Sequence, residues 1–406
     1  MATGREHTTI AQDIAESLRT LPAGSELAVR VVHTADHPVD SLTPRRRLGH
    51  FHAENTLSRR VLVLVSQNNC FVAGIEAHEF TTLLAQVDGR RAPQASISVN
   101  TCIEKVDTSG VLAKRMPLVR ALVAGYLRSL QKYARALAIP FVGVHLFARS
   151  QPEYLFAKSQ ENTGKHALGD MALIKWWKRT LDHALAYATA APPSTGDSQP
   201  KGTATTVTAY CVIPGASANS RPAFLDEHGS SAVGWHWGLP HPIESLADNC
   251  VLQFPDDPMT RLLAEPHSKE WSVSMLLEML AVTEECGSGR RTAYFSADMP
   301  ISAPACPEAS NAASTADQGS LTFEEYDQIL TVLFDREMDF SSLDAATKSS
   351  ERVTEYLSSQ FGITPAVVTT DGQDAVQALS AAAGVGSPPP VNDLSTAIRK
   401  RRKTSK

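Results

Sequence analysis

Apolar residues recur with two different periods along this chain. Near its start, Ile10, Ile14, Leu18 and Leu21 are spaced by three or four residues, as on one face of a helix. Pro22 follows directly and cannot continue a helix. The spacing therefore predicts an amphipathic helix that ends at this proline.

Four segments with a period of two follow and predict strands. They are residues 27–31, 59–65, 71–75 and 97–101. Residues 67–69, Gln-Asn-Asn, favour a turn, so the second and third strands should form a β-hairpin. Helical spacing returns over residues 118–137. This order predicts an antiparallel or mixed sheet with helices packed against it.

A central strand and a helix with two adjacent tryptophans come next. Residues 141–147 are short and apolar enough for a buried strand, and residues 168–185 have helical spacing. Adjacent helical residues point about 100° apart, so Trp176 and Trp177 cannot both face the core. Trp177 lies on the apolar stripe, which places it inward, as for ordinary core packing, and leaves Trp176 at the flank.

The rest of the chain alternates further elements with segments of low complexity. Strands are predicted at residues 207–213, 235–237 and 293–296, and helices at 275–282 and 321–333. The polar or small-residue segments are a surface loop at 191–206, a linker-like insertion at 300–320 and a mostly disordered tail at 346–406. We therefore predict one α/β domain over residues 1–345, a mixed central β-sheet surrounded by helices.

Composition and charge narrow the class of protein. The chain has 406 residues, 43% of them hydrophobic, and a formal net charge of −5, which disfavours a body that wraps DNA and suits a cationic partner. Its charged N-terminus lacks a secretory apolar run, and its widely spaced cysteines suggest a reduced compartment. We expect a soluble protein with no membrane contact. The basic residues 398–406 read as a nuclear import signal, a nucleic-acid-contacting tail or an inert solubilising tail.

No motif with a portable mechanism is present: the chain lacks a Walker loop, GxGxxG, HExxH and GxSxG. Acidic residues at two places in the chain remain as candidates for chemistry. Asp257 precedes Pro258 and is well placed to cap a helix that begins there, which leaves Asp256 without a local role. Asp107 ends a strand before a Thr-Ser-Gly turn and can bond its own backbone.

Three segments occur together in a known family. They are EKVDTSG at residues 104–110, HLFARSQPEYLF with GKH and KWW at 145–177, and FPDDPMTR at 254–261. As a set they resemble the fungal histone H3 acetyltransferases known as regulators of Ty1 transposition. The resemblance implies a fold similar to that of the CREB-binding-protein acetyltransferases.

The resemblance also implies a function and partners. The family transfers acetyl from acetyl-CoA to lysines of histone H3, in the core domain near the DNA entry site and in the tail. It acts on H3 with H4, presented by chaperones of the anti-silencing-function and nucleosome-assembly-protein types, in replication-coupled nucleosome assembly. We accordingly expect a nuclear enzyme that needs acetyl-CoA but no metal and binds no specific DNA sequence. The alternative is a catalytically weakened chromatin or chaperone-binding module on the same fold.

Site residues follow from the same resemblance, matched position by position. The expected catalytic residues are Asp107, Asp256, Asp257, Trp177 and Tyr154. The expected residues of the acetyl-CoA site are Phe147, Ala148, Arg149, Ser150, Gln151, Tyr154, His166 and Trp177. We expect Tyr154 and Trp177 to form two walls of a slot for the substrate lysine, with Asp107 and Asp256 orienting it and water taking its proton. Lysines of the same loop are expected to be solvated.

Two departures from the family pattern stand out. Many members carry an autoacetylated lysine two residues after the paired aspartates, where this chain has Met259. Methionine is neutral and linear like acetyl-lysine, so we expect Met259 to fill the same place without modification. The link between Tyr133 and Phe141 is also short where yeast-type members insert a long basic loop, so substrate or chaperone contacts made through that loop are not carried over to this chain.

Overall fold

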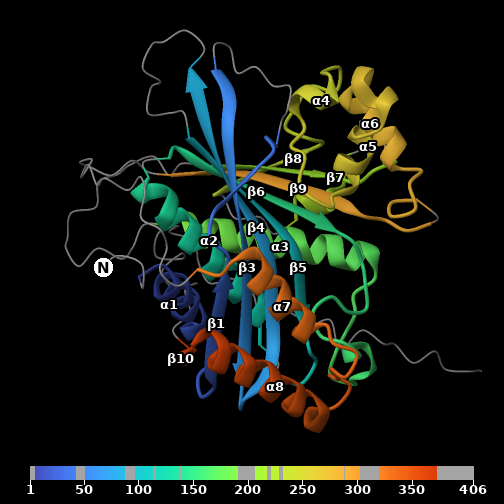
Figure 1. Cartoon of the computed structure of the whole chain (residues 1–406). Coiled ribbons are helices and arrows are strands. Elements are labelled where there is room, and N and C mark those ends of the chain that lie inside the picture. Colours follow the sequence, from blue (N-terminus) through green and yellow to red (C-terminus); the bar gives the residue numbers. More distant parts are fainter. Residues whose placement is uncertain are drawn as a thin grey trace, which may run out of the picture. The chain divides into compact units, whose positions relative to one another are not determined.

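The computed structural model (Figure 1) describes most of the chain and leaves out the predicted tail beyond residue 372. The described residues are 5–42, 51–86, 97–112, 116–137, 139–190, 206–216, 221–227, 232–287, 289–301 and 320–372. The predicted surface loop and linker-like insertion also lie outside the described residues, except at their ends.

A ten-stranded mixed sheet forms the centre of this part of the chain. Its strands are β1 (Glu26–His33), β2 (His37–Val39), β3 (Phe51–Gln67), β4 (Cys70–Gln86), β5 (Ile97–Thr108), β6 (Phe141–Ala148), β7 (Val207–Val212), β8 (Val233–Trp237), β9 (Ala293–Pro300) and β10 (Ala366–Thr369). The order is β10-β1-β3-β4-β5-β6-β9-β7-β8, and β2 pairs with β3. The pairs β5–β6 and β7–β8 are parallel and the other pairs antiparallel, which confirms the mixed sheet.

Helices cover both faces of the sheet (Figure 1). They are α1 (Arg5–Arg19), α2 (Leu118–Ala136), α3 (Asp170–Thr189), α4 (Ala247–Cys250), α5 (Pro258–Leu263), α6 (Val273–Leu280), α7 (Phe323–Leu333) and α8 (Leu343–Phe361). The first three bury their apolar stripes in one core, and α7 and α8 form a second core on the other face. The short helices α4, α5 and α6 share a third cluster with β7 and β9.

The predicted hairpin and helix boundaries are confirmed at several places. Asn68 and Asn69 both have positive φ, 50° and 61°, as the turn between β3 and β4 requires. Thr322 and Glu325 form a capping box at the start of α7, because each side chain binds the other residue's backbone N–H.

The predicted domain boundary at residue 345 is wrong for residues 346–372. This boundary would divide α8, whose side chains Ala346, Val353 and Leu357 are fully buried in the second core. Strand β10 then pairs antiparallel with β1 and forms one edge of the sheet. The segment has few large apolar residues, so composition alone suggested disorder. Its small and aliphatic residues are nevertheless spaced to face the core.

Helices α1 and α2 approach closely at Gly125. A Cβ added there would lie 2.6 Å from the Ile14 Cα, which leaves no room for a methyl group. We expect Gly125→Ala to destabilise the protein by about 1–3 kcal/mol, although alanine is the better helix former. Thermal unfolding measures this effect. Gly169→Ala is the control, because a Cβ there meets nothing within 4 Å; equal melting temperatures for both variants would contradict the close approach.

Candidate functional site

Asp107 at the end of β5 holds the loop that follows β6. Its Oδ2 accepts hydrogen bonds from the backbone N–H of Tyr154, Leu155 and Phe156 at 2.8, 2.9 and 3.3 Å. Its Oδ1 accepts one from its neighbour Thr108, as the local turn predicts. The carboxylate is therefore occupied mainly by backbone 47 to 49 residues away, so its geometry favours positioning the Tyr154 loop over direct contact with a substrate lysine.

Lys165 forms an ion pair with the carboxylate of Asp107. Its Nζ lies 2.7 Å from Asp107 Oδ1 and 2.6 Å from Ser159 Oγ, and the lysine side chain is only 6% exposed. The expectation that loop lysines are solvated is wrong for Lys165, because its ammonium neutralises a carboxylate that is itself 5% exposed. Lys158 is half-exposed and pairs with Asp339 at 3.2 Å.

The residues after β6 present aromatic and cationic groups near this loop. The Tyr154 hydroxyl donates to the Arg149 carbonyl, and burial raises the pKa of Tyr154 to about 12. Ser150 Oγ donates to the Leu168 carbonyl at 2.5 Å and ties the segment to the approach of α3. The Arg149 Nε is buried and has no hydrogen-bond partner among the described residues. The rings of Phe147 and Tyr294 of β9 pack in a tilted arrangement with their centres 4.6 Å apart.

The two tryptophans of α3 take the predicted positions. Trp177 is buried in the core that α1, α2 and α3 share, whereas Trp176 packs at the margin of that core. The centres of the two tryptophan rings lie 4.9 Å apart. Tyr154 packs against the second core, on the side of α7 and α8. The slot between Tyr154 and Trp177 thus stays a prediction, since the two rings belong to different clusters. His166 is exposed on the same loop, as are parts of its neighbours.

The loop before α5 is anchored over strands β4 and β6. Phe254 places its ring 5.6 Å from Phe80 and 4.8 Å from His145. Asp257 caps α5, because its carboxylate accepts from the Thr260 N–H at 3.3 Å, and Pro258 follows at the first helical position. The N-cap predicted from the sequence is confirmed.

The two aspartates of this loop differ in environment. Asp256 has positive φ (54°), points a 94% exposed carboxylate outward and pairs with Arg261 at 2.8 Å. Asp257 lies mostly buried, and burial raises the pKa of its carboxyl to about 7. Its charge also adds to burial in raising the pKa of Tyr294, whose hydroxyl is buried without a described hydrogen-bond partner. A carboxyl that titrates near neutral pH can accept a proton that an exposed aspartate cannot hold.

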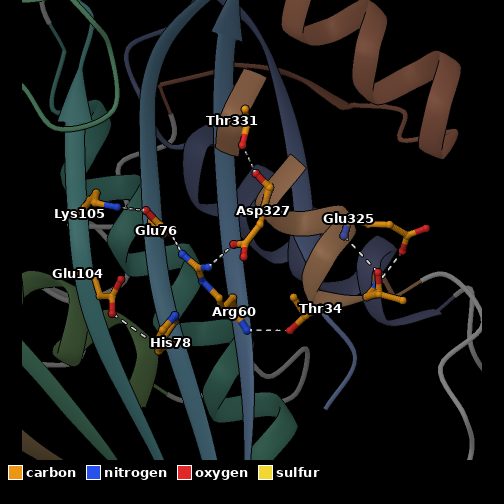
Figure 2. Close-up of polar contacts among 10 residues, drawn as sticks. Thr34, Arg60, Glu76, His78, Glu104, Lys105, Glu325, Asp327 and Thr331 are labelled. Carbon is orange, nitrogen blue, oxygen red and sulfur yellow. Dashed lines mark hydrogen bonds and ion pairs between the residues drawn. The ribbon is translucent and has the colours of Figure 1, made fainter. Parts of the chain in front are cut away.

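A charged network lies on β3, β4 and β5, and Figure 2 shows it next to α7. Its His78 ring lies 5.9 Å from that of Phe80, against which Phe254 of the Asp257 loop packs. Arg60 binds both the fully buried Glu76 and Asp327 of α7, at 2.7 and 2.8 Å, and Lys105 binds Glu76 at 2.6 Å. A bulge in β5 opposite Glu76 adds Glu104 next to Lys105.

Glu104 is the residue of this network without a cationic hydrogen-bond partner among the described residues. Its nearest partner is His78, 3.3 Å away (Figure 2), and burial lowers the pKa of His78 to about 4, so the imidazole is neutral at pH 7. Burial, together with the charge of Glu76, raises the pKa of Glu104 to about 7, and Asp256 adds to this. The sequence signal was present but missed: charged residues at positions 60, 76 and 104 and a histidine at position 78 interrupt the apolar pattern of these strands.

Comparison with protein families identifies the chain. Residues 134–356, more than half of it, match the histone acetyltransferase KAT11-type domain. The chain belongs to this family. The matched residues of the KAT11-type domain include β6, the Tyr154 loop, α3 and the Asp257 loop.

Two relatives of this KAT11-type chain are named histone acetyltransferase rtt109. The Aspergillus flavus protein is 28% identical over 68% of this chain, which spans about half (54%) of that protein's length. The Schizosaccharomyces pombe protein is 25% identical over 63% of this chain and 69% of its own. The crystal structure of Rtt109 from Aspergillus fumigatus is similar in fold, with a TM-score of 0.64 over 89% of this chain and 99% of that one, at 23% identity.

The described residues contain neither a membrane-spanning helix nor a cluster of metal ligands. No helix there has the length and apolar character to cross a membrane. No group of three histidine, cysteine or acidic side chains is placed to hold a metal ion in that part of the chain.

Proposed function

We propose that this protein is a histone lysine acetyltransferase that uses acetyl-CoA and acts on histone H3 bound to H4. The observation that carries the proposal is the convergence of distant segments within a KAT11-type chain. Asp107 of β5 binds the Tyr154 loop, and Phe254 brings Asp257 over the adjacent strands. The expected preference for a core-domain lysine, the dependence on the two chaperone types and the nuclear location remain part of this proposal.

Lysine acetylation needs a neutral amine, and Asp257 is placed to help supply it. A free lysine has a pKa of about 10.4, so deprotonation at pH 7 costs about 4.6 kcal/mol. A site that desolvates the ammonium lowers this cost. Asp257, with a pKa of about 7, accepts the proton better than an ordinary carboxylate would. This revises the expectation that water alone takes the proton, and it gives Asp257 the role of general base.

The segment after β6 fits the co-substrate. Coenzyme A brings a pyrophosphate and a pantetheine arm, which call for cations and free backbone or side-chain donors. The Arg149 Nε, for which the described residues offer no hydrogen-bond partner, supplies one such donor, and the ring of Phe147 offers an apolar wall. Arg149, Ser150 and Gln151 would hold the co-substrate here, and the exposed His166 of the same loop would be a further partner.

The decisive experiment is acetyl transfer from labelled acetyl-CoA to H3–H4, with and without each chaperone type, with the modified lysines located by mass spectrometry. We expect transfer by the parent protein and a large loss with Trp177→Ala, provided that the variant folds. Full activity of Trp177→Ala would remove the tryptophan from the site. Binding of H3–H4 without any transfer would favour the alternative, a non-catalytic chromatin module.

Glu104 is expected to bind a cation of the substrate, either the reacting ammonium or a neighbouring basic side chain. Glu104→Gln should raise KM for a basic H3 peptide roughly fivefold and leave kcat nearly unchanged. The reason is that one ion pair between a substrate cation and this carboxylate contributes about 1 kcal/mol to binding. Steady-state kinetics at pH 8 measures the effect. Asp335→Asn, which removes an acidic side chain just after the end of α7, is the control. If the KM values of parent and Glu104→Gln become equal for a peptide whose basic flanking residues are neutralised, the partner of Glu104 is a flanking cation. Equal KM values of the two proteins for the basic peptide would contradict the assignment.

Met259 is expected to make activity independent of self-acetylation. Its side chain is 4% exposed and packs in the cluster of α4, α5 and α6. Protein freed of acetyl groups by a deacetylase should keep the full initial rate, checked by mass spectrometry of the intact chain. Met259→Lys should lower the rate at least tenfold before any acetylation, since it buries an ammonium without a partner. A lag that disappears as another loop lysine becomes acetylated would contradict this.

A further inference from the structure

We propose that the outer face of α6 docks a basic, amphipathic segment of the histone substrate, away from the lysine that is acetylated. The proposal rests on the function proposed above. It concerns a second contact with the same substrate and uses none of the residues assigned to acetyl transfer.

The face is apolar and exposed. It consists of five side chains that are between 38% and 74% exposed: Ile243, Leu246, Met275, Met279 and Val282. Met275, Met279 and Val282 follow one another at positions i, i+4 and i+7 along and just after α6. Val273, Leu276 and Leu280 on the opposite side of the helix are fully buried. The helix thus has two apolar sides, of which only one is used by the described core.

The segment before α4 extends this face. The Ser274 N–H donates to the Ile243 carbonyl at 3.0 Å, and Leu246 pairs with Ser272 in an isolated β-bridge. These backbone contacts fix Ile243 and Leu246 beside the start of α6. An exposed cluster of five large apolar residues is more than the scattered exposure usual for a protein surface. Two methionines in it can adapt to the shape of a partner.

The surroundings of the face are strongly acidic, which determines the occupant. Residues 241–287 contain nine acidic and two basic residues, a formal charge of −7 against −5 for the whole chain. The two basic residues are engaged within the segment: Arg261 binds Asp256 and Glu285, and Lys269 lies 3.7 Å from Asp248. Glu244, Glu278 and Glu284 are exposed next to the apolar residues.

A partner that fits must therefore be apolar on one side and basic at its edges. A second copy of this chain would bring a like-charged rim against the first in a symmetric contact, which costs energy. A basic substrate protein satisfies both requirements. The buried side of α6 packs in the same cluster as Met259, two residues after Asp257, so the docked segment would lie about one helix diameter, ~10 Å, from that loop.

The test compares an intact substrate with a short one. Steady-state kinetics is run on purified H3–H4 and on a peptide of the same histone that contains the same acetylated lysine. For the triple variant Met275→Ser/Met279→Ser/Val282→Ser, we expect KM to rise about tenfold for H3–H4 and to stay unchanged for the peptide. The control is Leu343→Ser/Val367→Ser, which removes two side chains, 59% and 60% exposed, elsewhere on the surface. Equal KM values for parent and triple variant on H3–H4 would overturn the proposal.

Direct binding keeps the proposal testable if acetyl transfer fails. H3–H4 is titrated onto immobilised parent, triple variant and control, and we expect roughly tenfold weaker binding for the triple variant alone. Glu244→Gln/Glu278→Gln/Glu284→Gln should reduce the salt dependence of the association rate. No transfer by the parent combined with this binding pattern would refute the catalytic function and retain the docking surface. If the parent forms a dimer that the triple variant does not form, the occupant is a second copy of this chain and the proposal is overturned. The proposal is also overturned if deletion of residues 391–406 abolishes the difference in H3–H4 binding between parent and triple variant, because the occupant is then the chain's own basic C-terminus.

Discussion

Asp107→Asn is expected to lower kcat/KM by about 10²-fold or more and to destabilise the fold by about 3–5 kcal/mol. The variant keeps the size of the side chain but removes the charge that Lys165 neutralises at 2.7 Å. An ammonium only 6% exposed is then left without its counter-charge, which is the costly way to break a buried pair. The Tyr154 loop also loses a charged acceptor for three backbone N–H groups.

Removing both partners separates these two causes. In Asp107→Asn/Lys165→Met the uncompensated charge is gone, so denaturant unfolding should show that part of the lost stability returns. The rate should stay low, because the asparagine still holds the Tyr154 loop less firmly. Lys158→Met is the control for loss of a loop lysine, since its partner Asp339 remains in water. A rate that recovers fully with the double variant would show that Asp107 acts only through stability.

These contacts explain why the sequence predicted the parts of the site better than their connections. The cap formed by Asp257 involves residues within three positions, so the Asp-Pro pair alone predicts it. The turn bond of Asp107 to Thr108 is equally local and was foreseen. The bonds to residues 154–156 and to Lys165 join positions 47 to 58 apart, and no spacing rule encodes them. Sequence resemblance named Asp107 as important without giving the physical reason.

The fold shows the same division between local and distant information. Periodicity predicted the hairpin, the helix at 118–137 and the inward position of Trp177, because each depends on neighbours in one element. The bulge that brings Glu104 beside Lys105 depends on the register with β4. Strand β10 depends on an edge of β1 that lies some 340 residues earlier in the chain. Low-complexity composition cannot reveal such an edge, which is why the domain ends later than predicted.

Asp257→Asn is expected to lower kcat at pH 8 by about 10²-fold or more, the usual contribution of a general base. In the parent protein, Asp257 is protonated below its pKa of about 7 and cannot accept a proton from lysine. The rate should therefore rise with pH through about 7 and level off above it. The amide of the variant does not titrate, so this inflection in kcat should disappear. Glu270→Gln, which changes an exposed carboxylate further along the chain, is the control.

Stability should change in the opposite direction from activity. Burial raises the pKa of Asp257 above its unfolded value, so the folded state favours the neutral carboxyl. The contribution of this carboxyl to the free energy of unfolding is fully present below the pKa of the unfolded state and is lost as the pH rises through about 7. Asparagine keeps the N-cap and stays neutral at every pH. The melting temperature of Asp257→Asn minus that of the parent should therefore be larger at pH 8 than at pH 4. Glu104 also titrates near 7, but it is expected to act on KM, so Glu104→Gln should keep the inflection in kcat. An inflection that survives in Asp257→Asn and vanishes in Glu104→Gln would transfer the role of base to Glu104.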